Sequence, residues 1–446
     1  MAKKPTRRED RPAAPGRVLL VIALLAVFMF LAGAFVASGV SGSLTAYATD
    51  DDPVTDASGE ADQGFTEILY DEPAQAAEDV AADEEAVANQ DDSGSTYMTV
   101  AMIGDVLMHT YCVDSGAQAD GTYNFDHIFA NITDELSPFD VRVVNQETVL
   151  GGTELGLSDF PQFNSPQEIG DAEAEAGFNV VLCASNHSMD VGYEGLHREL
   201  EFWATNHPEV STIGATDVLS DDPQPANPCY VTVDDFTVAF LNFTDSTNGI
   251  EDPYGAVARL WEQTVLEQVA GAKANADMVV VFPHWGEENL LEPTDRQRYL
   301  AQLLLDAGVD VVIGAHSHTL EPVEVLTGAD GHQMVCYWSV GNFISAMETS
   351  ENMVGGMAEL TLRKDADGTC VVESYALKPV VTHWGSGDAM TTYLLSDYTS
   401  ALAASNGHAN MGVDWVQAHC ASVLGEDYNR ADCQLYVELN PPAQDE

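Results

Sequence analysis

Basic residues are scarce in this chain of 446 residues. Only 16 Lys and Arg stand against 72 Asp and Glu, which gives a formal net charge of −56 at pH 7. Proteins that bind nucleic acids need Lys and Arg to neutralise the phosphates. The composition therefore argues against nucleic acid as a partner, and we interpret the excess of carboxylates as a solvated surface that keeps the chain soluble.

Cysteine is also infrequent. The seven cysteines permit disulfides but do not require them. Cys420 and Cys433 lie near each other in the sequence and are the pair that most merits a test for a disulfide. The other five lie in apolar or strand-like surroundings, where they can be ordinary core thiols: Cys112, Cys183, Cys229, Cys336 and Cys370.

The few basic residues gather at the N-terminus. Six of the 16 lie before residue 18, and a run without charge extends from Val18 to Ser38. About 20 apolar residues make a helix of about 30 Å, which is long enough to cross the core of a bilayer. The basic flank predicts a cytoplasmic segment over 1–17, a transmembrane signal anchor over 18–38 and an extracytoplasmic remainder. Ala46-Tyr47-Ala48 leaves a cleaved signal peptide open as the alternative.

The composition changes again after the apolar run. Residues 39–96 are rich in Asp, Glu, Ala and Ser and contain few large apolar residues. Such a segment cannot bury enough surface to order itself, and its like charges extend it. We therefore predict a disordered acidic linker, then a folded domain over 97–380 and a C-terminal helical extension over 381–446.

Strand-like apolar runs alternate with helix-like segments through most of the predicted domain. This alternation is typical of an α/β architecture. Helices are expected at Pro166–Ala176, Tyr193–Thr205, Arg259–Ala274 and Thr294–Ala307. The later segments Met357–Leu362 and Cys370–Leu377 read as antiparallel strands, and they favour a second sheet.

Five polar clusters each follow one of the strand-like runs. Ligand sites in open α/β sheets lie at the carboxyl ends of the strands, so these clusters are expected to meet. Asp, Glu, Asn and His side chains at one place can surround one or two metal ions. The candidate metal ligands are Asp105, Glu147, Asn186, His284, His316 and His318, with His109 as a further candidate.

Three of these clusters suggest distinct chemical roles. Glu147 could bridge two metal ions, and Asn186 supplies a neutral oxygen. His187 is the candidate general acid, with Asp190 three residues later as the carboxylate that orients it. His316 and His318 flank Ser317, and in an extended chain residues i and i+2 point the same way, which would aim both imidazoles into one site.

Each residue taken alone also has an ordinary structural interpretation. Asp105 could cap a turn, Glu147 could be a surface carboxylate at a strand end, and His109 could be a partly exposed histidine. Five clusters in series are hard to explain by folding alone, because a buried polar group costs free energy unless it finds partners.

The clusters, in this order, resemble the bacterial CapA family of capsule or poly-γ-glutamate biosynthesis proteins, which is similar to calcineurin-like metallophosphoesterases. The resemblance covers about residues 99–377 and departs from the metallophosphoesterase pattern at His109, Ser185 and Ala315. It is carried by Gly104-Asp105, Asn145-Gln146-Glu147, Ser185-Asn186-His187 with Asp190, His284-Trp285-Gly286, Gly314-Ala315-His316-Ser317-His318 and Ser339-Val340-Gly341-Asn342-Phe343.

The resemblance implies a two-sheet α/β sandwich flanked by helices and a site for two divalent transition metal ions. Mixed carboxylate, amide and imidazole ligands suit Mn, Fe or Zn better than Ca. The implied function is synthesis, export or anchoring of an anionic surface polymer at the cell membrane, with a metal-dependent hydrolase-like site. Two alternatives stay open: a non-catalytic scaffold that binds the polymer or its synthase subunits, and a general metallophosphodiesterase or nucleotidase.

Overall fold

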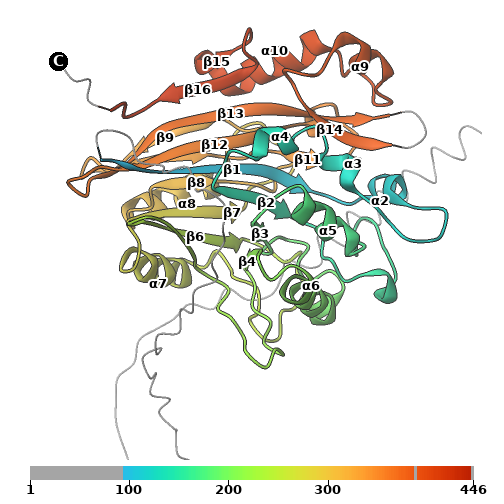
Figure 1. Ribbon diagram of the computed structural model, residues 1–446, viewed down its shortest axis with the longest axis horizontal. Helices are drawn as coiled ribbons and strands as arrows, with labels where there is room; N and C mark the ends of the chain where they lie inside the picture. The colour runs from blue at the N-terminus through green and yellow to red at the C-terminus, as the bar shows by residue number, and fades with distance from the viewer. Residues whose placement is uncertain (1–93, 386–388, 443–446) are drawn as a thin grey trace, which may run out of the picture. The chain divides into compact units, whose positions relative to one another are not determined.

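The computed structural model describes residues 94–385 and 389–442 (Figure 1). The predicted anchor at 18–38 and nearly all of the acidic linker at 39–96 lie outside the described residues. Among the residues that are described, no helix is long and apolar enough to cross a membrane.

The larger of two sheets has ten strands and is parallel in one half and antiparallel in the other. Strands β1 to β4 run parallel, and β12, β13 and β16 continue the sheet antiparallel on the other side of β1. The strands are β1 (Thr96–Val106), β2 (Val141–Gln146), β3 (Val180–Leu182), β4 (Ser211–Ile213), β11 (Asn342–Ile344), β12 (Val354–Lys364), β13 (Cys370–Trp384), β14 (Met390–Leu394), β15 (Tyr428–Asn429) and β16 (Gln434–Glu438).

The smaller sheet has six strands in the order β5-β6-β7-β8-β10-β9. Its four central strands are parallel, and β5 and β9 pair antiparallel at the two edges. The strands are β5 (Cys229–Val233), β6 (Phe236–Thr244), β7 (Met278–His284), β8 (Val311–Ile313), β9 (Val323–Thr327) and β10 (Gln333–Tyr337).

The helices begin and end within about three residues of the expected positions where the sequence predicted them. The capping box that Thr294 and Gln297 form at the start of α8 explains why that helix begins where it does. The helices are α2 (Thr110–Gly116), α3 (Asp126–Phe129), α4 (Thr133–Leu136), α5 (Glu168–Glu175), α6 (Gly192–Asn206), α7 (Glu262–Lys273), α8 (Asp295–Asp306), α9 (Ser400–Ser405) and α10 (Val413–Leu424), with 3-10 turns η1 (Thr153–Leu155), η2 (Glu351–Met353) and η3 (Gly425–Asp427).

The core has layers because successive strand residues point to opposite faces of a sheet. In β1, Met98 and Val100 join an apolar cluster with side chains of both sheets, whereas Ala101 and Ile103 join a second cluster with α5 and α6. A third cluster packs α7 and α8 against the other face of the smaller sheet. The expected two-sheet α/β sandwich with helices outside is confirmed for the described residues.

The last strands differ from the expectation of a separate second sheet. The segments Met357–Leu362 and Cys370–Leu377 form parts of β12 and β13, which extend the larger sheet because β12 pairs with β1 over eight residues. The second sheet is built instead from β5 to β10. Residues after the expected boundary at 380/381 include the end of β13 and strands β14 to β16 as well as helices α9 and α10 (Figure 1).

The cysteines of the described chain are all free. Cys420 lies buried in α10, and the Gln417 amide one turn earlier donates a hydrogen bond of 3.4 Å to the Cys433 sulfur. The two thiols selected from the sequence are therefore on the same side of α10, but they are not joined.

Two buried glutamates lie between the larger sheet and its helices. Neither oxygen of the Glu173 carboxyl has a hydrogen-bond partner, and Glu199 Oε2 accepts one from the Leu150 amide at 3.1 Å. Burial raises the pKa of Glu173 well above its usual value, and it raises the pKa of Glu199 to about 8. Both side chains are therefore held as neutral acids near pH 7.

We expect Glu199→Gln to raise the melting temperature at pH 8 by roughly 5 °C and to change it little at pH 5. In the unfolded chain this carboxyl ionises near pH 4.3, so the folded state loses stability as pH rises from there toward 8. Glutamine keeps the acceptor for Leu150 and removes the ionisation. Thermal unfolding at both pH values measures the effect, with Glu201→Gln, exposed on the same helix, as the control. Equal changes in melting temperature at pH 5 and pH 8 would show that the ionisation of Glu199 is not the cause.

Candidate metal centre

Side chains from both sheets meet where the carboxyl ends of their parallel strands come together. Asp105 lies near the end of β1, Glu147 directly follows β2, and His284 is the last residue of β7. Asn186 follows β3, and His316 and His318 follow β8. Gly104 allows the tight approach of the chain here, since a Cβ atom at this position would lie 1.8 Å from the Gly341 carbonyl oxygen.

The Glu147 carboxylate is central to the cluster. Its Oε1 atom lies 3.7 Å from His284 Nε2, 3.7 Å from His318 Nε2 and 3.9 Å from His187 Nε2. Glu147 is buried, and neither of its oxygens has a hydrogen-bond partner. A buried carboxylate without partners is costly, and a cation bound between it and the imidazoles would remove that cost.

One group of donors combines Glu147 with His284 and His316, whose ligand atoms lie within 4.8 Å of one another. His316 Nδ1 is 3.2 Å from His284 Nε2, and that nitrogen is 2.8 Å from the Asn186 amide oxygen. Burial and the neighbouring His316 lower the pKa of His284 well below its usual value. Burial and His318 lower the pKa of His316 to about 3. Both rings are therefore neutral and have lone pairs for a metal ion.

The second group combines Asp105, Glu147 and His318 within the same distance limit. His318 Nδ1 lies 3.0 Å from Asp105 Oδ2 and 3.0 Å from the Asn342 amide oxygen. Burial by itself would lower the pKa of His318, but the carboxylates of Glu147 and Asp105 raise it to about 10. The surroundings of His318 thus favour positive charge.

The backbone conformation at His316 and His318 differs from the extended conformation that the sequence predicted. Their φ angles are +100° and +59°, so neither residue is in the extended conformation from which the parallel orientation was predicted. A positive φ is uncommon for residues other than glycine and persists where the surrounding structure imposes it. The two ring centroids are still only 5.8 Å apart.

His187 borders the cluster and belongs to neither donor group. Its Nδ1 lies 2.6 Å from Asp190 Oδ2, and the same oxygen accepts a hydrogen bond of 2.7 Å from the Phe163 amide. The Phe163 ring packs edge-on against the His187 imidazole at 4.8 Å between centroids. Asp190 therefore fixes the ring and leaves Nε2 directed toward Glu147.

His109 packs edge-on against the same Phe163 ring. The ring centroids of these two residues are 5.2 Å apart, and His109 Nδ1 contacts the Leu107 carbonyl and accepts from the Ala346 amide. In the described chain His109 is in neither of the two groups that could hold a metal ion.

Several contributors were not selected from the sequence as site residues. The Asn145 amide nitrogen lies 2.6 Å from Asp105 Oδ1, and the Asn342 amide oxygen lies 3.0 Å from His318 Nδ1. Asn248, on the loop after β6, lies 3.4 Å from Asn186 and 3.5 Å from His187 Nδ1. Asn145 lies two residues before Glu147 in the sequence and could have been recognised, whereas nothing local marks Phe163.

The donor set fits a divalent transition metal. Two carboxylates, an amide oxygen and three imidazoles are hard-to-borderline ligands of the kind that Mn, Fe and Zn accept. The unpartnered oxygens of Glu147 and the neutral rings of His284 and His316 support this fit. The described residues thus hold two donor groups that share one carboxylate, which is an arrangement suited to adjacent cations.

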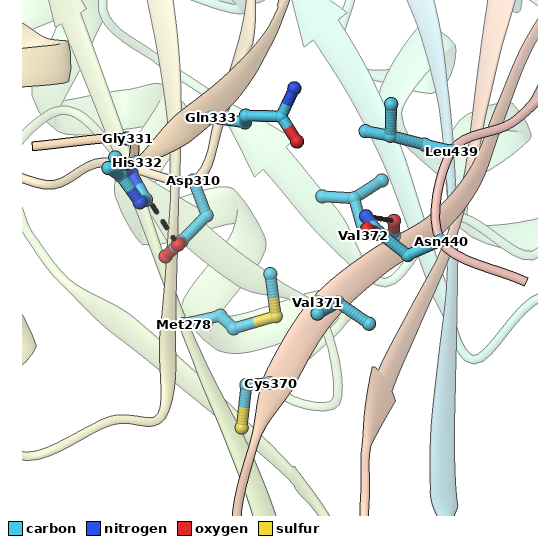
Figure 2. A pocket seen from close by; sticks show the side chains of 10 residues that line it. All are labelled: Met278, Asp310, Gly331, His332, Gln333, Cys370, Val371, Val372, Leu439 and Asn440. Carbon is cyan, nitrogen blue, oxygen red and sulfur yellow. Dashed lines mark hydrogen bonds and ion pairs between the residues drawn. The ribbon is translucent and has the colours of Figure 1, made fainter. Parts of the chain in front are cut away.

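A cavity of about 210 Å³ lies at the other end of the strands (Figure 2). Its lining includes Met278, Gln333 and Cys370, which are the first residues of β7, β10 and β13. Asp310 Oδ2 accepts a hydrogen bond from the Val279 amide, and Oδ1 lies 3.9 Å from His332 Nε2. This cavity is therefore separate from the candidate metal centre.

The sequence was compared with protein families, and the central part of the chain matches one of them. Residues 99–347 match the family described as "Bacterial capsule synthesis protein PGA_cap". The chain is 32% identical over 197 residues to the "PGA biosynthesis protein CapA" of Bacillus subtilis (strain 168), covering 44% of this chain and 50% of that protein. It therefore spans only half the length of that relative.

Two further comparisons extend over more of the chain. The "Capsule biosynthesis protein CapA" of Bacillus anthracis is 27% identical over 329 residues, covering 70% of this chain and 74% of that protein. A solved structure of 5′-nucleotidase from Candida albicans SC5314 aligns with 12% identity and a TM-score of 0.37, covering 61% of this chain and 52% of that one.

Proposed function

Because the chain belongs to the bacterial capsule synthesis protein family PGA_cap, we propose that it acts in the synthesis, export or anchoring of an anionic surface polymer through a metal-dependent hydrolase-like site. The observation that carries this proposal is the buried, unpartnered Glu147 carboxylate shared by two donor groups. A pure scaffold has no need for a carboxylate held in this costly state.

Asp105, Glu147, Asn186, His284, His316 and His318 would hold the ions. Bound divalent cations supply positive charge that polarises a phosphoryl or acyl oxygen and makes water a better nucleophile. Only ten Lys and Arg follow residue 17, so the chain itself offers little positive charge for an anionic substrate.

His187 is the group that would donate a proton to the leaving atom. Asp190 Oδ2 accepts a hydrogen bond from Nδ1–H, which orients the ring and leaves Nε2 free to donate. Nε2 faces Glu147 at 3.9 Å, so the donated proton lies beside the carboxylate that both donor groups share. The Phe163 ring packs against the imidazole and limits the access of water to it.

The cellular setting belongs to the same proposal. The chain would be anchored by residues 18–38 in the cytoplasmic membrane, with the domain outside, where it would meet the polymer or its synthase subunits. Fractionation of cells tests this location. Recovery of a chain that begins near Thr49 in the culture medium would contradict anchoring.

The full chain, purified in detergent without chelator, is expected to contain Mn, Fe or Zn and to hydrolyse a phosphodiester or a γ-glutamyl polymer. Elemental analysis measures the metal, and release of p-nitrophenol or of γ-glutamyl fragments measures hydrolysis. If the folded chain contained almost no metal, the hydrolase hypothesis would be wrong and the non-catalytic scaffold would remain as the explanation. Cleavage of phosphodiesters without action on polymer would favour a general phosphodiesterase or nucleotidase.

A further inference from the structure

The C-terminal part of the chain brings two cysteines into one apolar cluster. Cys420 lies in α10, and Cys433 lies in the turn between β15 and β16. Cys420 belongs to the buried cluster between the sheets and α10, and Cys433 packs against the same cluster. In Figure 1 α10 lies beside the β15–β16 hairpin, and it contacts β15. This region follows residue 347, where the match to the capsule synthesis family ends.

The Cys433 sulfur lies within about one helical turn of Cys420. Gln417 Nε2 is 3.4 Å from Cys433 Sγ, and the Arg430 carbonyl oxygen is 3.6 Å from the same sulfur. Gln417 and Cys420 are three residues apart on α10, a spacing that puts side chains on one helix face with Cβ atoms about 5–6 Å apart. The turn therefore approaches α10 at the range over which disulfides join two segments.

Tyr428 gives separate evidence that the two sulfurs lie close together. It is buried in β15 and pairs with Leu435 of β16. Burial raises the pKa of the Tyr428 hydroxyl, and Cys420 and Cys433 raise it further. Burial and the neighbouring Cys433 raise the pKa of Cys420 to about 12. Such mutual effects need short distances, because charge interactions weaken with separation.

The two thiols differ in access to solvent. Cys420 is fully buried, whereas Cys433 is half-buried. Cys433 would therefore react first with an external disulfide and form a mixed disulfide. Rotation about χ1 of Cys433 then exchanges its contact with the Gln417 amide for Cys420, whose nearness offsets its small thiolate fraction. The external S–S bond breaks, the new bond forms, and two protons and two electrons pass to the oxidant, which leaves as two thiols.

We propose that Cys420 and Cys433 are a disulfide site that joins α10 to the turn between β15 and β16. β16 pairs with β13 over Ser374–Leu377, so the bridge would hold α10 and the hairpin at the edge of the larger sheet. Disulfides persist in oxidising surroundings. Formation of the bridge in the cell therefore rests on the extracytoplasmic location that belongs to the proposed function.

Oxidation of the purified full chain with oxidised glutathione tests the site. After alkylation of free thiols in denaturant, peptide mass spectrometry is expected to find Cys420 linked to Cys433 and the other cysteines alkylated. The oxidised chain should melt about 4 °C higher than the reduced chain, because the bridge restricts the unfolded state. Cys433→Ser should remove this difference. Cys370→Ser is the matched control, since Cys370 is also half-buried but its sulfur contacts the Gly368 carbonyl at 3.6 Å.

Alkylated Cys420 and Cys433 after oxidation, or a bridge from either one to another cysteine, would overturn the site. A melting difference that Cys433→Ser and Cys370→Ser reduce equally would overturn it as well. Mapping of the chain quenched with acid directly from cells separates the proposals. Free thiols in cells, together with a bridge formed by glutathione, would sustain the site and contradict the extracytoplasmic location. The metal content of Cys433→Ser should equal that of the unaltered chain, so failure of the bridge leaves the metal centre intact.

Discussion

Replacing Glu147 with Gln is expected to weaken metal binding by at least about 100-fold and to abolish hydrolysis. The Glu147 carboxylate belongs to both donor groups, so its loss affects both positions at once. Glutamine has nearly the same shape and carries no charge. Because burial raises the pKa of Glu147 well above its usual value, the folded chain without metal should tolerate a neutral side chain there.

Calorimetric titration with Mn²⁺ and Zn²⁺, together with elemental analysis of the purified chain, measures the loss. Glu287→Gln is the matched control, because Glu287 is exposed three residues after His284 and is in neither donor group. Thermal unfolding should show that both variants are folded. If the folded Glu147→Gln variant kept its full metal content, the claim that Glu147 is a ligand shared by both donor groups would be wrong.

His187→Ala and His316→Ala should differ in what they lose. His187→Ala should keep most of its metal while hydrolysis falls by about 10²–10⁴-fold, the range typical for a lost general acid. His316→Ala, and His318→Ala likewise, should lose metal because each removes a member of a donor group. The contrast depends on Asn186, which lies 2.8 Å from His284 Nε2 and can serve as the ligand contributed by this cluster.

Bound metal and hydrolysis rate are measured side by side in these variants. His197→Ala is the control, since His197 also pairs with an aspartate, Asp217, at 2.9 Å, but away from the centre. Asp190→Asn should act through His187, lowering the rate and shifting its pH profile while metal remains. If His187→Ala loses metal as completely as His316→Ala, His187 is a ligand and the proposed acid is wrong.

The candidate ligands could be predicted from a local pattern in the sequence, namely polar residues that directly follow apolar, strand-like runs. Asp105, Glu147, Asn186 and His284 could be selected because each follows an apolar run, and the carboxyl ends of parallel strands meet at one edge. The same reasoning brought His109 into consideration, although among the described residues His109 is in neither donor group and packs against Phe163. A pattern of this kind gives the end of a strand at which a residue lies, but not which neighbours surround it.

The sequence by itself determined the α/β class, the starts of helices such as α8 and the set of strand-end residues, because these depend on side-chain periodicity and capping within a few positions. Only the tertiary structure decided that β12 and β13 extend the first sheet. It alone decided that Glu147 lies between His284 and His318, and that the loop carrying Asn248 reaches His187. These contacts join residues far apart in the chain, and which of them form is set by the packing of two sheets against each other.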